Sequence, residues 1–257
     1  MEVKNLKFGY DKRSVILDNF NADFPAGKIT SIIGPNGCGK STLISLLTKI
    51  NRPLGGSILI DGRQIGELKG KAFAREVASV FQINDGERDL TVEELVSYGR
   101  TPHKTAFSGL TEEDEEIIAQ SLEQTGLSGM REKRLCNMSG GERQRVYIAM
   151  ALCQQPKILF LDEPTSYLDI YYQIEVLEIV KRINRERNIT VIMVLHDINQ
   201  ALHYSDFIMV MKAGRIVAFG KAEEVVTEKM IEDVYGVKCN RLTDKDNKEY
   251  FLPVKTV

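Results

Sequence analysis

Apolar residues in this chain fall into short continuous runs and longer stretches with helical spacing. Continuous runs of about five apolar residues are typical of strands buried on both faces of a sheet. Three mostly apolar stretches of this kind, at residues 28–33, 157–162 and 190–195, lead directly into glycine or polar residues. Parallel strands place their carboxyl ends at one edge of an open sheet, where ligands bind. The pattern therefore predicts an α/β protein with a ligand site at that edge.

Alternating stretches flank these runs. Residues 3–8 and 20–24 alternate apolar and polar side chains, which predicts half-buried antiparallel strands near the N-terminus. Residues 57–60, followed by Asp61-Gly62, indicate another such strand. Residues 207–219 contain two apolar stretches on either side of Lys-Ala-Gly, which is a hairpin signal. From Lys221 onward the pattern indicates a short helix followed by a second, smaller hairpin.

Between residues 84 and 155 the apolar spacing becomes helical. Two helix starts carry capping boxes, Thr91-Val-Glu-Glu94 and Thr111-Glu-Glu-Asp114. In a capping box the threonine and the acidic residue three positions later each satisfy a free backbone N–H of the other. The acidic run 112–116 suits the positive end of a helix, so we interpret it as a solvated helix start and not as catalytic.

The run from Gly34 to Thr42 matches the pattern G-x-x-x-x-G-K-[ST] between a predicted strand and a predicted helix. Its glycines allow backbone N–H groups to surround a β-phosphate, at the positive end of the following helix. Lys40 is expected to reach the β- and γ-phosphate oxygens, and Ser41 to hold Mg²⁺. The alternative is a glycine-rich turn that binds nothing. The expected nucleotide contacts are Gly34, Pro35, Asn36, Gly37, Cys38, Gly39, Lys40, Ser41 and Thr42.

Two adjacent carboxylates, Asp162 and Glu163, end the second apolar run. Neighbours on a strand point to opposite sides, so both can face one ligand only where the strand ends abruptly, and Pro164 fits such an end. Asp162 is predicted to lie in the outer shell of Mg²⁺ and Glu163 to act as general base toward water. An ordinary acidic strand end is the alternative. His196, after the third run, is either a γ-phosphate contact or a structural histidine.

The segment Met138-Ser-Gly-Gly-Glu142 precedes a stretch whose apolar residues repeat at helical spacing up to Cys153. Ser139, Gly140 and Gly141 therefore open a helix. Free N–H groups and the helix dipole make such an end a second anion site. An ordinary cap by Ser139 would require one glycine at most and does not explain two.

These motifs, from Tyr10 to His196, resemble those of the ATP-binding subunits of ATP-binding-cassette (ABC) transporters. The resemblance implies that two copies pair head to tail, so that Ser139-Gly-Gly of one copy completes the ATP site of the other. It also implies that Tyr10 stacks on adenine and that the loop ending at Asp169 crosses the dimer interface. The implied catalytic residues are Lys40, Gln82, Glu163 and His196, and the implied Mg²⁺ contacts are Ser41, Gln82 and Asp162.

The fold implied by this resemblance is an α/β P-loop NTPase cassette. It has a mixed core sheet, an N-terminal antiparallel β-subdomain and a helical subdomain that carries the signature. We expect one ATPase domain over residues 1–257. Residues 1–83 and 156–220 would form the nucleotide-binding core with the β-subdomain, residues 84–155 the helical subdomain, and residues 221–257 a short C-terminal extension.

The signature departs from the family's usual Leu-Ser-Gly-Gly-Gln at two positions, Met138 and Glu142. Methionine keeps the volume and apolar character of leucine, so this difference is expected to have little effect. Glu142 adds a negative charge near the helix N-terminus, which favours the helix but would repel a γ-phosphate if it faced inward. We expect Glu142 to face outward.

The stretch Gly99-Arg-Thr-Pro-His103 resembles importer subunits for iron-siderophore complexes, with haem and cobalamin importers as relatives. A helix that ends at Gly99 before Pro102 also explains these residues physically. The resemblance implies Mg²⁺-dependent ATP hydrolysis that energises import of an iron chelate through a separate transmembrane permease, with an extracytoplasmic solute-binding protein acting indirectly. The alternative is a soluble ABC ATPase in iron–sulfur cluster assembly or another process without transport.

Composition agrees with a nucleotide-binding module. The net charge of −2 gives no reason to expect nucleic acid as a partner. No apolar run approaches the length of a membrane span, and the first residues lack a signal-peptide pattern. We therefore expect a peripheral protein at the cytoplasmic face of the cell membrane. The four cysteines lack metal-ligand spacing and are interpreted as free thiols.

Overall fold

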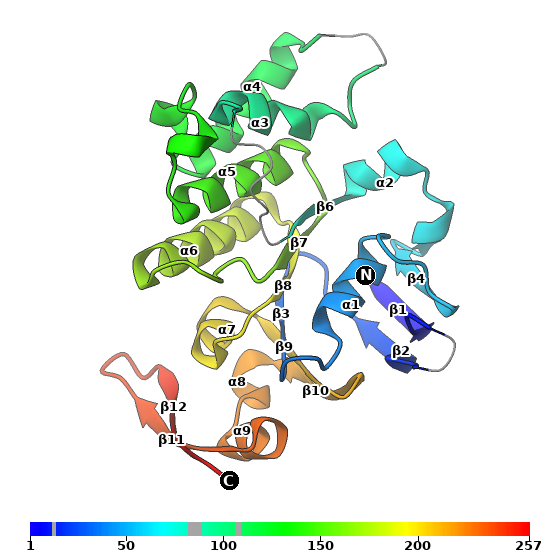
Figure 1. Ribbon diagram of the computed structural model, residues 1–257, viewed down its shortest axis with the longest axis vertical. Helices are drawn as coiled ribbons and strands as arrows, with labels where there is room; N and C mark the ends of the chain where they lie inside the picture. The colour runs from blue at the N-terminus through cyan, green and yellow to red at the C-terminus, as the bar shows by residue number, and fades with distance from the viewer. Residues whose placement is uncertain (12–13, 82–88, 106–108) are drawn as a thin grey trace. The chain divides into compact units, whose positions relative to one another are not determined.

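The computed structural model describes residues 1–257 with the exception of 12–13, 82–88 and 106–108 (Figure 1). The described residues divide into two units, of which unit 1 comprises Met1–Gln64 and Ile192–Val257, and unit 2 comprises Ile65–Val191. Strand β8 (Thr190–Val194) contains the division, since its first two residues belong to unit 2 and its last three to unit 1.

Unit 1 begins with an antiparallel sheet in which the strand order is β2-β1-β4-β5. The strands are β1 (Glu2–Phe8), β2 (Leu17–Asp23), β4 (Gly55–Ile60) and β5 (Arg63–Gln64). One face of β1 is buried through Val3, Leu6 and Phe8, while the residues between them are mostly exposed. The half-buried antiparallel strands predicted near the N-terminus are therefore confirmed.

A second, mixed sheet of unit 1 contains β3 (Ile29–Ile33), which is buried along its whole length. It pairs in parallel with β9 (Phe207–Lys212), and β9 pairs antiparallel with β10 (Arg215–Lys221). Ala213 and Gly214 connect β9 to β10 with φ angles of 48° and 75°. Two consecutive positive φ angles match the right-handed twist of a tight hairpin. The hairpin predicted there is confirmed.

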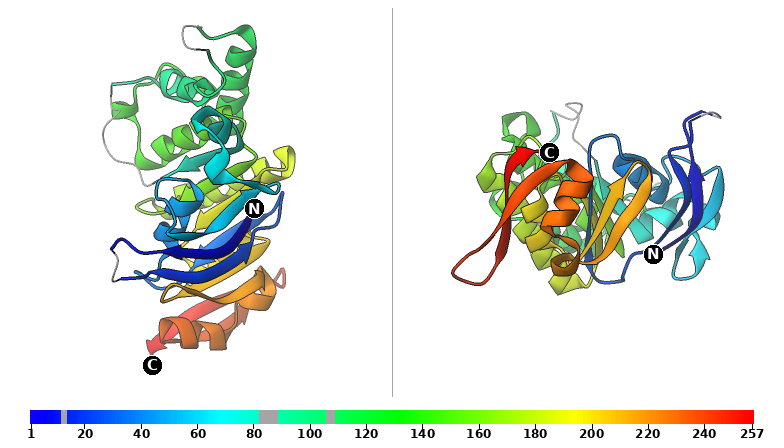
Figure 2. Two further views of the ribbon diagram at one scale, coloured as in Figure 1. Left: turned by 90° about the vertical axis from the view of Figure 1, so that its right-hand side faces the viewer. Right: turned by 90° about the horizontal axis from the view of Figure 1, so that it is seen from below.

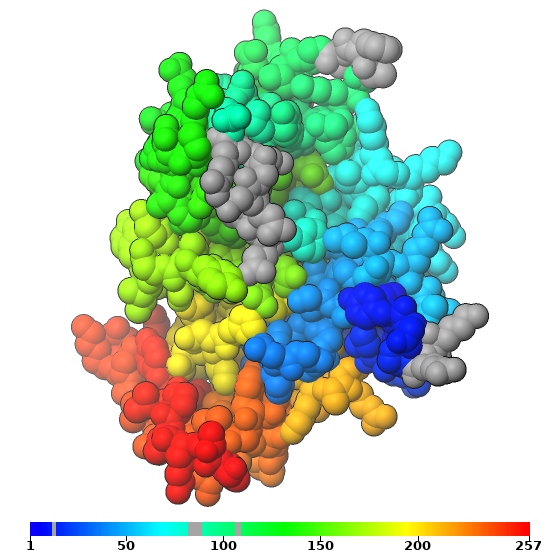
Figure 3. All heavy atoms as spheres, viewed as in Figure 1, coloured from blue at the N-terminus to red at the C-terminus, as the bar shows by residue number. Residues whose placement is uncertain are grey.

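Helices and a C-terminal hairpin complete unit 1. The helices are α1 (Lys40–Leu47), α7 (Ile198–Tyr204), α8 (Ala222–Val225) and α9 (Glu228–Tyr235). The hairpin consists of β11 (Val237–Thr243) and β12 (Glu249–Thr256) (Figure 2). Side chains of this C-terminal part form a continuous surface patch, coloured orange and red in Figure 3.

The tail contains two helices where the sequence pattern predicts one. The backbone is extended at Val226 and Thr227, and the Thr227 side chain accepts a hydrogen bond from the Met230 N–H. Thr227 is therefore the N-cap of α9, and the helical stretch is divided into α8 and α9 just before it. The predicted hairpin after the helical stretch is confirmed.

Unit 2 contains two parallel strands and most of the helices. The strands are β6 (Val77–Val80) and β7 (Ile158–Asp162). They pair in parallel, with Val77 opposite Ile158. The α-helices are α2 (Gly70–Glu76), α3 (Val92–Ser97), α4 (Glu112–Gln124), α5 (Gly140–Cys153) and α6 (Ile170–Arg187). Short 3₁₀ turns are η1 (Ile65–Glu67), η2 (Tyr98–Arg100), η3 (Ser128–Met130) and η4 (Leu135–Asn137).

Both predicted capping boxes are present in unit 2. The Thr91 N–H donates to the Glu94 carboxylate at 2.7 Å, and the Glu94 N–H donates to the Thr91 hydroxyl at 3.2 Å. Thr111 and Asp114 form the same reciprocal pair at the start of α4. The acidic run 112–116 begins a helix, as predicted, but the expectation that the run is solvated is wrong for Asp114, which is buried. Behind these caps, apolar side chains of α3, α4 and α5 pack into one buried cluster.

A buried ion pair lies beside this cluster. The Arg100 guanidinium donates from Nε to the Asp114 carboxylate at 2.7 Å, and Arg100 and Asp114 are only 4% and 6% exposed. Arg100 Nη1 also donates to the Cys153 carbonyl oxygen at 2.9 Å and to Gln155 Oε1 at 3.0 Å. Burial alone would raise the pKa of Asp114. Hydrogen bonds from Arg100 and Thr111 outweigh burial and lower that pKa from 3.8 to about 2.

No helix in the part of the chain that the structure describes combines the length and the apolar content needed to span a bilayer.

The Asp114→Asn variant tests the buried ion pair. It leaves the Arg100 charge buried without its counter-charge, so we expect the free energy of unfolding to fall by about 3 kcal/mol at pH 7. Because the folded pKa of Asp114 lies below its ordinary value, the stabilisation is present above pH 3.8 and is lost as the pH falls toward 2. Denaturant titrations at several pH values measure both effects.

Glu116→Gln is the matched control, because Glu116 is exposed on the same helix. We expect this variant to unfold within about 0.5 kcal/mol of the original chain at pH 7. Equal stability of the Asp114→Asn and Glu116→Gln chains across the acid range would contradict a stabilising role of the ion pair.

Candidate functional site

The phosphate loop of unit 1 has the backbone that its sequence pattern predicts. Gly34, Gly37 and Gly39 have φ angles of 151°, 75° and 105°, which side chains with a Cβ rarely adopt. A Cβ on Gly37 would meet no atom within 4 Å, so the space in front of this glycine is open. No side chain caps α1, which starts at Lys40 directly after the loop. The N–H groups of its first turn therefore suit a bound phosphate.

The side chain of Lys40 binds the backbone of this loop. Its side chain is 6% exposed, and Nζ donates to the carbonyl oxygens of Gly34 at 2.7 Å and Pro35 at 3.1 Å. Ser41, the expected Mg²⁺ contact, is exposed at the start of α1. A buried ammonium, the open space at Gly37 and an exposed hydroxyl fit the chemistry of a Mg²⁺-bound triphosphate.

Tyr10 lies beside the same helix. Its hydroxyl oxygen is 3.4 Å from Thr42 Oγ1, and its ring meets the Phe8 ring edge-on at 5.1 Å between centroids. Tyr10 is 67% exposed, so most of its ring is accessible to solvent. Unit 1 thus brings together the residue expected to stack on adenine and the helix expected to bind the phosphates.

Cys38 is the one loop residue with a thiol, and its side chain is 4% exposed. Burial raises the pKa of this thiol, which disfavours the reactive thiolate. All four cysteines are free, as predicted. Cys38 therefore contributes packing inside the loop, and its main-chain oxygen accepts a hydrogen bond from the Gly214 N–H at 2.9 Å.

His196 follows β8 and belongs to unit 1. The Leu195 N–H donates to the Ile32 carbonyl oxygen at 3.3 Å, so the end of β8 lies beside the end of β3. His196 is exposed at this edge, two residues beyond β8, and Gly34 directly follows β3. The next residue, Asp197, caps α7 by accepting a hydrogen bond from the Gln200 N–H at 2.9 Å. The histidine is therefore on the strand edge where the ligand site is expected.

In unit 2 the strand β7 ends at Asp162, and Glu163 adopts a φ angle of 53°. A left-handed conformation, which residues other than glycine rarely adopt, turns the chain sharply at Glu163. The abrupt strand end predicted from the two adjacent carboxylates is therefore present. The Ser166 hydroxyl donates to Glu163 Oε2 at 3.0 Å, and the Ser166 N–H donates to the Glu163 carbonyl oxygen at 3.1 Å. These bonds fix the turn and the Glu163 carboxylate together.

The signature segment starts α5 in unit 2. Ser139 is the N-cap, with its hydroxyl accepting from the Glu142 N–H and its own N–H donating to Glu142 Oε2 at 2.8 Å. Lys133 Nζ binds both carboxylate oxygens of Glu142, at 3.0 and 3.1 Å. Burial raises the pKa of Glu142, but these bonds lower it overall. The Glu142 charge is therefore engaged by the cap and by Lys133, and Met138 packs in the apolar cluster.

Packing explains one of the two signature glycines. A Cβ on Gly141 would lie 2.2 Å from the Tyr172 ring, whereas a Cβ on Gly140 would lie 3.6 Å from Leu168, an ordinary contact. Asp169 caps α6 by accepting a hydrogen bond from the Tyr172 N–H at 3.1 Å. Unit 2 therefore brings the signature glycines next to the loop that ends at Asp169, and α5 requires a glycine at 141 to approach α6.

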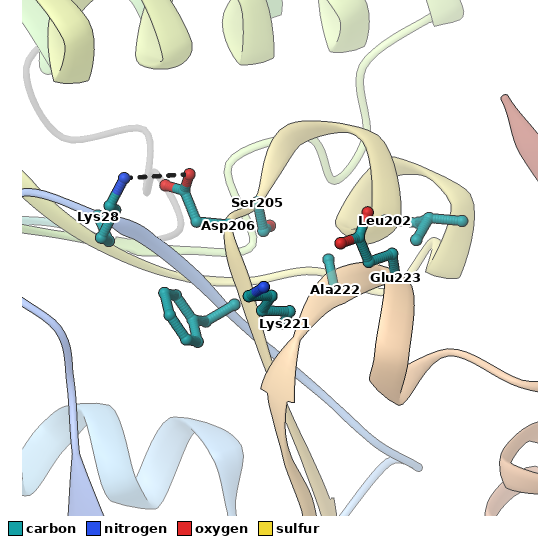
Figure 4. Close-up of a pocket in the computed structure, with 8 residues that line it drawn as sticks. Lys28, Leu202, Ser205, Asp206, Lys221, Ala222 and Glu223 are labelled. Atoms are coloured by element: carbon teal, nitrogen blue, oxygen red, sulfur yellow. Dashed lines mark ion pairs between the residues drawn. The ribbon is translucent and has the colours of Figure 1, made fainter.

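Gln82 lies outside the described residues, so its expected contact with Mg²⁺ stays a prediction. Unit 1 contains the phosphate loop, Tyr10 and His196, and unit 2 contains the carboxylates and the signature. A cavity of about 430 Å³ in unit 1 is lined by charged and uncharged residues, and among the charged ones Lys28 and Asp206 form an ion pair of 3.8 Å (Figure 4). None of the expected site residues that the structure describes lines this cavity.

Comparisons with known proteins agree with the phosphate loop and with the strand that ends in Asp162 and Glu163. The family model described as "ABC transporter" matches residues 17–166. The chain is 44% identical to the petrobactin import ATP-binding protein FpuC of Bacillus anthracis over 92% of this chain and 87% of the relative. It is 41% identical to the iron(3+)-hydroxamate import ATP-binding protein FhuC of Bacillus subtilis over 98% of this chain and 94% of the relative.

A solved structure shares the fold. It is the dimeric ATP-binding cassette MJ0796 in a post-hydrolysis state with ADP and phosphate bound, with a TM-score of 0.73 and 29% identity over 86% of this chain and 98% of that chain. Both have the α/β cassette architecture, which in this chain comprises a mixed sheet, an antiparallel β-sheet and a helical part. Given the family match and the identity to curated relatives over nearly its whole length, the chain belongs to the ABC transporter family.

Proposed function

We propose that this chain is the ATP-hydrolysing subunit that energises import of an iron-siderophore complex through a separate transmembrane permease. The observation that carries the proposal is its identity of 44% and 41% to ATP-binding proteins of petrobactin and iron(3+)-hydroxamate import, over more than nine tenths of the chain. The alternative of a soluble ATPase in iron–sulfur cluster assembly is not favoured, because these relatives are import proteins.

The first step is binding of the nucleotide by unit 1. The open glycine backbone and the uncapped start of α1 provide N–H donors to the phosphates. Lys40 would exchange its bonds to the Gly34 and Pro35 carbonyl oxygens for bonds to the β- and γ-phosphates. The exposed ring of Tyr10 would stack on adenine, and its hydroxyl contact with Thr42 would keep the ring beside the helix.

Hydrolysis requires a positioned water and compensation of the charge that develops on the γ-phosphate. Glu163 would orient the water and accept its proton, since Ser166 holds one of its carboxylate oxygens and the left-handed backbone directs the side chain. Mg²⁺, when bound, would neutralise charge on the phosphate oxygens. Ser41, Gln82 and Asp162 would hold it, and His196 would contact the γ-phosphate.

A second copy of the chain would complete each site. The start of α5 presents the N–H groups of Gly140 and Gly141, which suit a γ-phosphate from another copy, while the Ser139 N–H already donates to Glu142 Oε2. Glu142 does not oppose this role, because Lys133 and the capping box compensate its charge. Asp169 would cross the interface beside this helix. Binding of two ATP molecules would then close the pair head to tail, and release of phosphate would open it.

The permease and an extracytoplasmic solute-binding protein would choose the solute, with this chain at the cytoplasmic membrane face.

The stretch from Gly99 to His103 supports the proposed solute class less strongly than its resemblance to siderophore importers suggests. A Cβ on Gly99 would lie 2.2 Å from the Met150 carbonyl oxygen, and Arg100 is buried on Asp114. Packing alone therefore explains both residues, so the solute proposal rests on the relatives and not on this motif.

The Glu163→Gln variant tests the catalytic assignment. Glutamine keeps the shape of the side chain but cannot accept the proton of water, so we expect ATP hydrolysis to fall about 100-fold or more. The dissociation constant for Mg-ATP should stay within about threefold, because the phosphate loop is unchanged. Phosphate release and equilibrium binding of a fluorescent ATP analogue measure the two quantities.

Glu186→Gln serves as the control, since Glu186 is exposed on α6 of the same unit. Its hydrolysis rate should equal that of the original chain. A Glu163→Gln chain that hydrolyses ATP at a near-normal rate would remove Glu163 from the catalytic role.

Uptake of labelled iron chelates tests the transport function. We expect a host strain without this chain to lose uptake of a radioactive ferric siderophore of the hydroxamate or petrobactin class while retaining uptake of free ferrous iron. The original chain and Glu186→Gln should restore uptake, and Glu163→Gln should not. Normal uptake of every chelate of both classes in the deletion strain would refute the proposed solute class.

A further inference from the structure

The C-terminal hairpin of unit 1 is bound to helix α7 through the side chain of Asn199 (Figure 1). Asn199 Nδ2 donates a hydrogen bond to the Phe251 carbonyl oxygen at 3.1 Å, and the Phe251 N–H donates to Asn199 Oδ1 at 2.8 Å. One side-chain amide thus satisfies both backbone polar groups of a residue on β12, as a partner strand would do. The hairpin is therefore tied to α7 by a specific pair of bonds.

A ring contact on the same side of α7 supports this docking. The rings of His203 and Tyr250 lie 4.5 Å apart between centroids. Because Asn199 and His203 are four residues apart, they lie on one face of the helix. Phe251, between the two contacts on β12, is only 3% exposed. One face of α7 is therefore covered by β12.

The other end of α7 is fixed without the hairpin. The hydroxyl oxygen of Ser205, the C-cap residue, lies 2.6 Å from that of Ser31 on β3. The Asp206 carboxylate accepts a hydrogen bond from the Ile29 N–H at 2.9 Å on the same strand. The C-terminal end of α7 is thus bound to the strand that leads into the phosphate loop. Asn199, the second residue of α7, instead binds the first turn of the helix to β12.

This first turn directly follows His196, the expected γ-phosphate contact. Two residues separate His196 from Asn199, and the first of them, Asp197, is the N-cap of α7. The Asp197 carboxylate accepts a hydrogen bond from the Gln200 N–H at 2.9 Å, so the cap and the first turn move together. A displacement of the first turn would therefore displace His196, and the bonds between Asn199 and β12 resist that displacement.

We propose that Asn199 is a positioning residue for ATP hydrolysis, which holds His196 in place by tying the first turn of α7 to the C-terminal hairpin. This inference rests on the proposed contact of His196 with the γ-phosphate. A group that is already in place when charge develops on the phosphate stabilises the transition state without rearrangement. The hairpin of β11 and β12 then contributes to catalysis and is not merely an appendage of the cassette.

The competing explanation is that Asn199 only anchors the hairpin. In that case Asn199→Ala should speed hydrogen exchange at the Phe251 amide and leave the turnover number, kcat, unchanged. If Asn199 acts through His196, kcat should fall, and this fall should disappear in a chain that already lacks the histidine. A double-mutant cycle of Asn199→Ala and His196→Ala separates the two explanations.

Alanine has a higher helix propensity than asparagine, so the Asn199→Ala substitution does not weaken α7 itself. We expect this variant to lower kcat about tenfold, since a misplacement of about 1 Å can cost about 100-fold in rate. The dissociation constant for Mg-ATP should stay within about twofold, because the phosphate loop is unchanged. In the His196→Ala background the same substitution should change kcat less than about twofold.

Asn240→Ala is the matched control, because Asn240 is an exposed asparagine on β11 of the same hairpin. It should change neither kcat nor the exchange of the Phe251 amide. Release of phosphate from γ-labelled ATP, with long incubations for the slow variants, measures kcat. Calorimetric titration measures Mg-ATP binding, and amide exchange by mass spectrometry reports on β12.

An unchanged kcat in Asn199→Ala would overturn the proposal, as would a tenfold effect that persists in the His196→Ala background. Loss of Mg-ATP binding in Asn199→Ala would also overturn it, because the role of Asn199 would then be structural. Normal hydrolysis by His196→Ala would remove the histidine from the mechanism and the inference with it. Failure of the unchanged chain to hydrolyse ATP is a different result, which would overturn the proposed function itself.

Discussion

The phosphate loop of this protein depends on one close approach, between the Gly34 backbone and the carbonyl oxygen of Met211. β3 and β9 run parallel up to this point, and any side chain at position 34 would collide with the end of β9. Because Gly34 can lie against β9, the chain turns into the loop and delivers Lys40 to the start of α1. The same approach brings the loop next to the turn between β9 and β10, where the Gly214 N–H donates to the Cys38 carbonyl oxygen.

In unit 2 the motifs of the family serve packing and chemistry together. Gly141 lets α5 approach Tyr172 on α6, and the same residue belongs to the helix start that would face a phosphate. Arg100 neutralises Asp114 in the interior and also binds the carbonyl oxygen of Cys153 at the C-terminal end of α5. Both ends of the signature helix are therefore fixed by residues that lie far from it in sequence. Such a helix can present its N–H groups without rearrangement, as electrostatic stabilisation of a transition state requires.

Features with a local physical cause could be predicted from the sequence. The capping boxes at Thr91 and Thr111, the hairpin at Ala213-Gly214 and the strand–loop–helix order around Lys40 each depend on a few neighbouring residues. The left-handed backbone of Glu163 was foreseen only as an abrupt strand end, since glutamate does not itself favour that conformation.

Contacts between distant residues could not be predicted in this way. Arg100 and Asp114 lie on a 3₁₀ turn and a helix that no short pattern connects. The reason for a glycine at 141 also lies in another helix, because the clash would be with Tyr172. The break between α8 and α9 depends on Thr227, whose capping role competes with continued helix. At Arg100, Asp114 and Gly141 tertiary packing decided between local options that the sequence pattern left open, whereas the Thr227 cap is a local contact.

If this cassette drives a membrane permease, the permease should be recovered with it in an affinity pull-down. Tagged Glu163→Gln chain is incubated with ATP and detergent-solubilised membranes of its own host, and the recovered proteins are identified and quantified. We expect recovery of polytopic membrane proteins in a fixed ratio to two copies of the chain, with ATP and not with ADP. Recovery of soluble scaffold proteins alone would contradict the transport function while leaving the ATPase chemistry intact.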